Sequence, residues 1–431
     1  MKIEYIPLEA TGKFSKFMTD FAQHKQAIDD LISDVCDRQD IPSALARKQN
    51  MSQENRQVLV QSLTQQYLSV NASLAVINNI SLLNAASTFT VSCGHQLNIF
   101  GGPMYVFFKI ATVIQLCKYL KTTYPQYNFV PVHWMATEDH DVEEISYVQL
   151  FGRKISWQTN QTGCTGDLNT QDLQPLMEEI ADLPEIFKAA YSKNNNLADA
   201  TRYYLNEVFG EDGLVILDAN QFALKSLFKA VMKDEIKNQT AEKRVEQSNT
   251  LLSQMGYAPQ IHARPINLFY LQPGSRERII KLEDETYSVL NTPKSWTEEE
   301  ILIEIEQQPE NFSPNVVLRP LYSQMILPDV AFVGGPAEMA YWLQLTHLFA
   351  HYKVPFPVLV PRLFGMIVNS AVEKKMQNLG ITVGDVFKPE HELRQALVEK
   401  AGLLPDFDSL LHKPLKAGFE AIQSAVNAID T

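Results

Sequence analysis

Two apolar, strand-like runs that each lead into a Gly-Gly-Pro turn constrain the fold of this chain most. The run 89–93 is followed by a loop and a helix that opens at Pro103, and the run 330–333 is followed by a helix that opens at Pro336. Short β-branched runs joined in this way to helices are typical of buried parallel strands, because parallel strands need a long crossover connection. The sequence therefore predicts an α/β fold built on a parallel sheet.

The rest of the chain divides into regions of different patterning. Apolar residues recur at helical spacing near the start, and the middle is mixed and more polar, as in an insertion that splits the sheet in sequence. Further strands are predicted at 129–135, 214–217, 316–318 and 356–360. The predicted regions are an N-terminal helical region, 1–85; the first part of the core, 86–150; a connecting insertion, 151–314; the second part of the core, 315–365; and a C-terminal helical region, 366–431.

Composition argues against several classes of partner. The chain has 37 Lys and Arg against 50 Asp and Glu, a formal net charge of −13 that repels phosphate backbones, so nucleic acid is not expected. The four cysteines lack the C-x-x-C spacing of a zinc or redox site, and no run approaches the roughly 18 apolar residues of a membrane span. The first residues lack the apolar core of a secretory signal. We expect a cytoplasmic protein that does not bind a membrane.

The two Gly-Gly-Pro turns are candidate anion sites. Their paired glycines, Gly101 with Gly102 and Gly334 with Gly335, let a ligand approach the backbone closely. The helix that follows presents free N–H groups and the positive end of its dipole, which can hold a carboxylate or a phosphate. Each turn can equally serve only to reverse the chain.

Polar residues follow the first predicted strand directly. Gly94, His95, Gln96 and Asn98 stand where open α/β sheets place their ligands, beyond the carboxyl end of a strand. His95 can donate to an oxyanion or act as an acid or base near neutral pH, or it can be purely structural.

The densest group of titratable residues follows the second predicted strand. Glu138, Asp139, His140 and Asp141 cannot all be buried and charged without partners, so they should face solvent, a cation or an amine. An amine-bearing substrate suits them best. A divalent metal and a solvated helix start are the alternatives, and no metal site is predicted because the spacing matches no known ligand set.

Residues near the second turn supply the opposite charge. Arg319 and Arg362 follow predicted strands, and their planar guanidinium groups can clamp a carboxylate or phosphate, or pair with the surplus acids. Glu338 and Tyr341 lie in the first turns of the second Gly-Gly-Pro helix, and we include both as candidate substrate-binding residues, although an aromatic side chain at such a position is more typical of a core.

The sequence resembles the cysteine-adding enzymes of bacillithiol biosynthesis, also called cysteine ligases. The resemblance extends from the N-terminus past Arg362 and implies a Rossmann-like core similar to class I aminoacyl-tRNA synthetases and nucleotidylyltransferases, interrupted by an insertion. The segments that carry it are Gly94-His-Gln, Phe100-Gly-Gly-Pro-Met-Tyr, 130–144, Asn315-Val-Val-Leu-Arg-Pro and 331–342.

The resemblance also implies a reaction, the formation of an amide between the carboxyl of cysteine and the amine of glucosaminyl malate. ATP or another activating nucleotide is a possible cofactor, but Leu97 and Asn98 replace the Gly and the second His of the His-x-Gly-His signature of the synthetases. Family members continue into a helical coiled coil, and this sequence ends where that segment would begin. A homodimer is therefore expected only if the coiled coil is present.

These expectations combine into one scheme for the site. Glu138, Asp139 and Asp141 would hold or deprotonate an ammonium group, with His140 or His95 as general base, and the glycine turns would hold acid groups together with Arg319. Two other function classes stay open. They are a metal-dependent hydrolase built on residues 138–141 and a non-enzymatic module that binds a small molecule.

Overall fold

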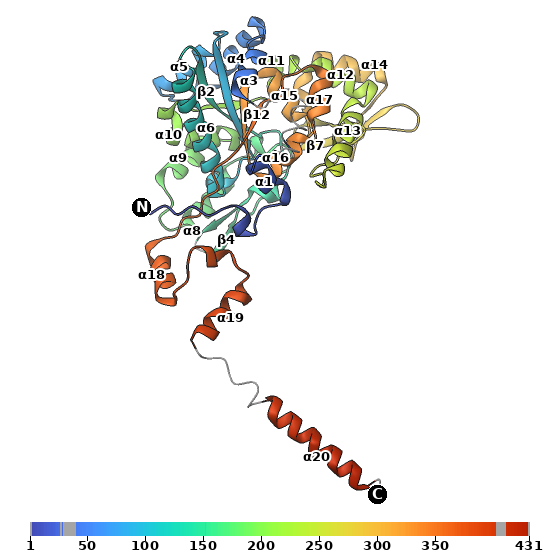
Figure 1. The fold of residues 1–431 in the computed structure, drawn as a ribbon. Coiled ribbons are helices and arrows are strands. Elements are labelled where there is room, and N and C mark those ends of the chain that lie inside the picture. The colour runs from blue at the N-terminus through green and yellow to red at the C-terminus, as the bar shows by residue number, and fades with distance from the viewer. Residues whose placement is uncertain (1, 26–27, 29–39, 151, 402–410, 430–431) are drawn as a thin grey trace. The chain divides into compact units, whose positions relative to one another are not determined.

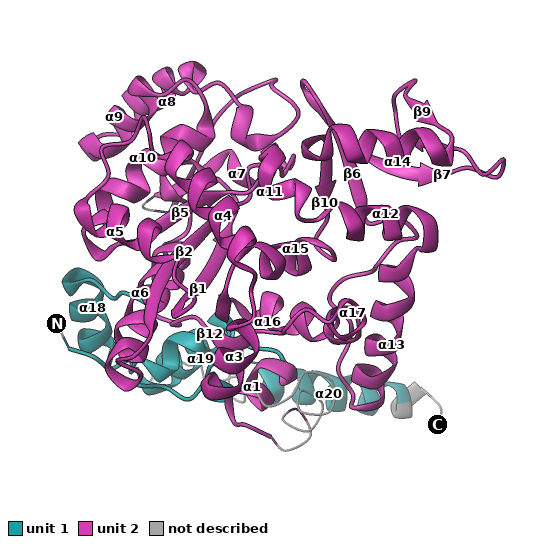
Figure 2. Ribbon diagram, turned by 90° about the horizontal axis from the view of Figure 1, so that it is seen from above, with its two compact units in different colours: residues 1–15, 366–431 teal, residues 16–365 magenta. Residues whose placement is uncertain are grey.

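The structure is a computed structural model that describes all residues except 1, 26–27, 29–39, 151, 402–410 and 430–431 (Figure 1). The described residues form two compact units (Figure 2). The larger unit comprises residues 16–365, and the smaller one comprises 1–15 together with 366–431. The helices of the smaller unit are α18 (Ser370–Leu379), α19 (Glu390–Lys400) and α20 (Lys413–Ile429). No described helix of either unit is long and apolar enough to cross a membrane.

A five-stranded parallel sheet forms the centre of the larger unit. Its spatial order is β12-β11-β1-β2-β5. This is the doubly wound order of a Rossmann-like fold, in which the chain runs outward from a central strand first to one side and then to the other. The prediction of an α/β fold with a Rossmann-like parallel core is confirmed. The strands are β1 (Thr88–His95), β2 (Asn128–Met135), β5 (Val215–Asp218), β11 (Asp329–Gly334) and β12 (Val358–Pro361).

Helices from the N-terminal region and from the connection between β1 and β2 pack on this sheet. The helix α6 (Met104–Thr123) begins directly after Pro103, connects β1 to β2 and packs against both strands. The helix α3 packs on β11, and α4 and α5 pack on β5. The N-terminal helices are α1 (Lys16–Ala22), α3 (Ile41–Lys48), α4 (Gln53–Gln66) and α5 (Leu74–Leu82). The other helices here are α7 (Val142–Ile145), α8 (Gln174–Glu179), α9 (Glu185–Lys193) and α10 (Leu197–Phe209).

A second, antiparallel sheet with the order β10-β6-β7-β8-β9 lies entirely within 268–314. Figure 1 shows β7 with α12, α13 and α14 on one side of the unit and α5, α6, α9 and α10 on the other. The strands are β6 (Leu268–Gln272), β7 (Ser275–Lys281), β8 (Tyr287–Val289), β9 (Ser295–Trp296) and β10 (Phe312–Pro314); β3 (Tyr147–Leu150) and β4 (Arg153–Ser156) form a hairpin. The helices are α11 (Phe222–Ser226), α12 (Lys229–Asn238), α13 (Thr240–Gln254) and α14 (Glu298–Gln307).

Two sequence predictions about this region need correction. The strand β5 lies inside 151–314, yet it pairs with β2 in the main sheet, so that segment is not one continuous insertion. The predicted strand at 316–318 is wrong: these residues form a turn, because the Asn315 side chain accepts hydrogen bonds from the N–H groups of Val317 and Leu318. Arg319 therefore begins the helix α15 (Arg319–Ile326) and does not follow a strand.

The order of the sheet brings the two Gly-Gly-Pro segments together. The strands β1 and β11 are parallel neighbours, although more than 200 residues separate them in the chain. Their carboxyl ends, His95 and Gly334, lie at the position where the winding of the sheet changes direction, which is where doubly wound sheets bind ligands. The helices that follow are α6 after β1, and α16 (Pro336–Leu343) with α17 (Thr346–Tyr352) after β11.

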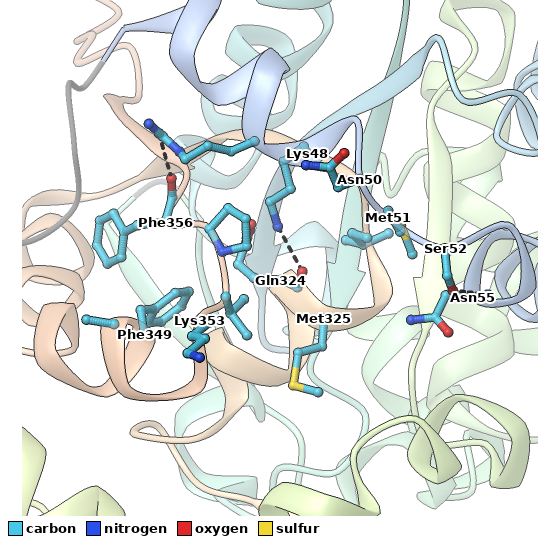
Figure 3. Close-up of a pocket in the computed structure, with 15 residues that line it drawn as sticks. Lys48, Asn50, Met51, Ser52, Asn55, Gln324, Met325, Phe349, Lys353 and Phe356 are labelled. Carbon is cyan, nitrogen blue, oxygen red and sulfur yellow. Dashed lines mark hydrogen bonds between the residues drawn. The ribbon is translucent and has the colours of Figure 1, made fainter.

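The opposite end of β11 is held by a buried polar network. Asp329 is fully buried and accepts hydrogen bonds from Thr90 (2.9 Å), Ser92 (2.6 Å) and Gln324 (2.7 Å). The ammonium group of Lys48, on α3, donates to the Gln324 carbonyl oxygen at 2.8 Å, beside a cavity of about 680 Å³ (Figure 3). Burial raises the pKa of Asp329 and lowers that of Lys48, while each group favours the charged form of the other.

Removing the carboxylate from this network should destabilise the fold strongly. Asp329→Ala leaves three donors without their acceptor and removes the negative charge that offsets the buried Lys48 ammonium, so we expect the free energy of unfolding to fall by about 3–5 kcal/mol in chemical denaturation. The control is Asp212→Ala, which breaks the exposed pair with Lys118 and should cost less than about 1 kcal/mol. Equal losses in the two variants would contradict the assignment.

Candidate active site

A cavity of about 730 Å³ opens at the carboxyl ends of β1 and β11. One wall comes from the main sheet and the start of α16, and the other comes from the antiparallel sheet and the segment that precedes it. Ten of the sequence-predicted site residues line this cavity. They are Gly94, His95, Gln96, Glu138, Asp139, Arg319, Gly335, Glu338, Tyr341 and Arg362.

Six sequence-predicted residues are not among those that line the cavity. They are Asn98, Gly101, Gly102, His140, Asp141 and Gly334. The Asn98 side chain donates to the Glu144 carbonyl oxygen at 3.1 Å, and Asp141 accepts from the Glu144 N–H at 3.0 Å as the N-cap of α7. These two side chains therefore shape the loop behind the cavity.

The first Gly-Gly-Pro turn is built for chain reversal. Gly101 and Gly102 have φ angles of +78° and +66°, which residues with a side chain rarely adopt. A Cβ atom on Gly101 would lie 2.7 Å from the Phe107 ring, and one on Gly102 would lie 2.6 Å from Asn98. Both glycines are thus required by the turn itself.

The second turn carries its own acid. Glu338 accepts a hydrogen bond from the Gly335 N–H at 2.8 Å and so caps the helix α16. Lys109 then joins this carboxylate to the end of β1, because its ammonium group lies 2.6 Å from Glu338 and 2.9 Å from the Gly94 carbonyl oxygen. Sequence reasoning did not propose Lys109; the available signal was a lysine on the otherwise apolar face of the helix after the first turn.

The charges of the acidic segment are partly matched by buried cations. Glu138 forms an ion pair with Lys225, which is fully buried on α11 and also donates to the Phe312 carbonyl oxygen at 2.7 Å. Lys225 is another residue that the sequence patterns did not indicate. The pairing fixes Glu138 at the wall of the cavity.

Asp139 is the acidic residue best placed to stay ionised. It accepts hydrogen bonds from the backbone N–H of His140 at 2.8 Å and from the side-chain amide of Gln96 at 3.3 Å. Burial raises the pKa of Asp139, but the neighbouring groups His140, Arg276 and Gln96 outweigh burial and lower it to about 2. An ionised carboxylate therefore faces the cavity at neutral pH.

His95 faces the cavity as a neutral imidazole. Burial is the main cause that lowers its pKa to about 3, and the nearby charges of Lys109 and Arg362 lower it further. Its ring packs edge-on against Tyr105, with ring centroids 5.5 Å apart. A neutral imidazole can donate one hydrogen bond and accept another, but with so low a pKa it is a weak base.

The two predicted arginines lie on the same side as Glu338. Arg319 donates to the Tyr341 hydroxyl at 2.9 Å, and Arg362 stacks on Tyr105, 4.8 Å from the ring centre. The Nε atom of Arg362 is buried, and no described residue accepts a hydrogen bond from it.

The cavity as a whole carries more positive than negative side chains. Its six cationic residues are Lys109, Arg264, Arg276, Arg278, Arg319 and Arg362, and its four acidic residues are Glu138, Asp139, Glu144 and Glu338. This balance opposes the charge of the whole chain, −13. The site therefore suits a ligand that bears both carboxylates and an amine.

Two features of the described side chains bear on the binding of a metal or a nucleotide. Among the described residues, no three His, Cys, Asp or Glu side chains are grouped closely enough to hold a metal ion. In the segment 94–98, Leu97 is buried and the Asn98 side chain donates to α7, so only Gly94, His95 and Gln96 line the cavity.

Known proteins are similar to this chain over nearly its whole length. The model of the bacillithiol biosynthesis BshC N-terminal Rossmann-like domain matches residues 1–363. Two relatives named "Putative cysteine ligase BshC", from Flavobacterium psychrophilum and Cytophaga hutchinsonii, are 39% and 40% identical to this chain. The alignments cover 98% and 93% of this chain and 81% and 76% of the relatives. The chain therefore belongs to the BshC family of bacillithiol biosynthesis proteins.

Proposed function

We propose that this protein is a cysteine ligase that joins the carboxyl of cysteine to the amine of glucosaminyl malate in the last step of bacillithiol biosynthesis. Family membership and the names of the relatives support this reaction. The structural observation that supports it is the mixed charge of the cavity, whose lining includes four acidic and six cationic residues. Cysteine and glucosaminyl malate together bring two amines and three carboxylates.

The acidic part of the cavity fits the amine. Asp139, with its pKa lowered to about 2, would hold the ammonium group as a carboxylate. Glu144 accepts from Gln96 at 2.7 Å, and burial together with the charges of Asp141 and Asp139 raises its pKa. Two nearby carboxylates whose pKa values are shifted in opposite directions can serve different roles. The carboxylate with the lowered pKa, Asp139, suits an ion pair with the ammonium group, and the one with the raised pKa, Glu144, is the better acceptor for the amine proton.

The cationic part of the cavity fits the acid groups. Arg362 has a buried Nε without an acceptor among the described residues, and Arg319 is oriented by Tyr341. Either guanidinium can bind a carboxylate through two parallel hydrogen bonds. The amide can form only from an activated cysteinyl group, for instance an acyl adenylate made with ATP, whose nucleotide leaves as the C–N bond forms. The neutral His95 can donate to the carbonyl oxygen of that group, which becomes negatively charged when the amine attacks.

The substrates and the cellular compartment of the protein follow from the same proposal. The substrates are small molecules, and a thiol substrate suits the reducing cytoplasm. Three of the four cysteines, Cys93, Cys117 and Cys164, are buried free thiols, and the fourth, Cys36, lies outside the described residues. A homodimer stays a prediction of the family resemblance.

Deleting the gene tests the reaction in the cell. We expect mass spectrometry of low-molecular-weight thiols to show loss of the cysteinyl glucosaminyl-malate thiol and accumulation of its amine precursor, because the final amide bond is no longer made. The intact gene should restore the thiol. An unchanged thiol pool in the deletion strain would reject the proposed reaction.

Two isosteric variants test which aspartate serves the amine. Asp139→Asn removes the charge that faces the cavity, so we expect kcat/KM for glucosaminyl malate to fall about 100-fold. Asp141→Asn keeps a side-chain oxygen that can cap α7 and should change kcat/KM less than about threefold. A loss in Asp141→Asn as large as that in Asp139→Asn would show that Asp141 also acts on the substrate.

A further inference from the structure

Arg276 comes from the antiparallel sheet but contacts the acidic segment of the core. It lies on β7, two residues before Arg278, so both side chains are on the same face of the strand, and both line the cavity. Only 9% of the Arg276 side chain is exposed to solvent. Neither arginine was indicated by the sequence patterns.

The guanidinium of Arg276 is oriented from three sides. Its Nε donates to the Ser313 hydroxyl at 3.1 Å, and its Nη1 donates to Nδ1 of His140 at 2.9 Å. Its central carbon lies 4.0 Å from the centre of the Phe269 ring, which packs against one face of the plane. A charged group held in this way loses little conformational entropy when it binds a ligand.

The remaining N–H groups of Arg276 are available to a ligand. None of the described residues accepts a hydrogen bond from Nη2. Arg276 forms an ion pair with Asp139. The distance from Nη1 of Arg276 to Oδ1 of Asp139 is 3.6 Å, which is too long for a hydrogen bond. Asp139 thus balances the charge of Arg276 without occupying its donors.

The same contact determines the state of His140. Arginine only donates hydrogen bonds, so Nδ1 of His140 must act as an acceptor and the ring proton must sit on Nε2. Asp139 Oδ1 competes for a proton on Nδ1, but it lies 3.6 Å away against 2.9 Å for Arg276. His140 is therefore engaged with Arg276 and, consistently, is not among the residues that line the cavity.

We propose that Arg276 binds a carboxylate of the malate group of the substrate, and that His140 is a positioning residue that orients Arg276. This inference rests on the proposed function for the identity of the substrate. The wall that carries Arg276 also carries Arg264 and Arg278, so it can match a group with two carboxylates. His140 then acts as a hydrogen-bond acceptor and not as the general base.

Binding measurements on the full chain test the role of Arg276. We expect Arg276→Met to weaken the binding of glucosaminyl malate in isothermal titration calorimetry about 10- to 100-fold, through loss of a charge-assisted bidentate contact. Arg276→Lys keeps the charge without the fork and should fall between that variant and the unmodified chain. Arg153→Met, which removes an exposed arginine from the β3–β4 hairpin, is the control and should bind normally.

Each outcome separates this inference from the proposed function. Unchanged affinity in both Arg276 variants would overturn the inference and leave the ligase reaction intact. L-malate is the second probe: if the unmodified chain binds L-malate through Arg276 but does not bind glucosaminyl malate, the proposed function fails and the role of Arg276 stands. Absence of binding to either probe would reject both.

Kinetics of two His140 variants test the positioning role. His140→Asn can place its side-chain oxygen near the position of Nδ1 and should cost at most a few-fold in kcat/KM. His140→Leu removes the acceptor and should raise KM for glucosaminyl malate about 10-fold with little change in kcat. A general base would instead lose about 10²- to 10⁴-fold in kcat in both variants, and that result would overturn the assignment.

Discussion

The ammonium group of Lys109 joins the two halves of the site. It donates to the Gly94 carbonyl oxygen at the end of β1 and to Glu338 in the first turn of α16, and Glu338 in turn holds the Gly335 N–H. Burying the Lys109 ammonium without hydrogen-bond acceptors would cost free energy. The burial of Lys109 therefore favours the arrangement in which the Gly94 carbonyl oxygen and Glu338 both contact it. His95, the last residue of β1, and Arg362, which directly follows β12, lie at the same edge of the sheet because β1 and β12 both pair with β11.

Charge neutralisation divides the acidic segment into different roles. Glu138 is matched by the buried Lys225, and Asp141 caps a short helix, whereas Asp139 is ionised at the cavity wall. Four adjacent titratable residues thus have four different environments. The division arises because each side chain meets a different element: α11, α7, the loop at Gln96, or the strand β7.

The antiparallel sheet contributes charged side chains to the cavity as well as enclosing it. Side chains alternate between the two faces of its strand β7, and Arg276 and Arg278, two residues apart, both line the cavity. A cationic wall opposite acids of the core suits substrates of mixed charge. It also explains how a chain with a net charge of −13 can offer a site to carboxylates.

Sequence patterns alone located the five strands of the main sheet and the two Gly-Gly-Pro turns, although the strand expected at 316–318 is a turn. The β-branched runs near Val91, Val132 and Val333 form buried parallel strands because their apolar side chains require cover on both faces, and Pro103 and Pro336 mark the helix starts. The sequence also located most of the cavity-lining residues, since parallel strands end at a common edge. Tertiary structure alone decided which acids were neutralised, that β5 joined the main sheet, and that Lys109, Lys225 and Arg276 reached the site. The physical reason is that pairing partners such as Lys225 and Glu138 lie 87 residues apart, and no local pattern encodes a contact between side chains so distant in the chain.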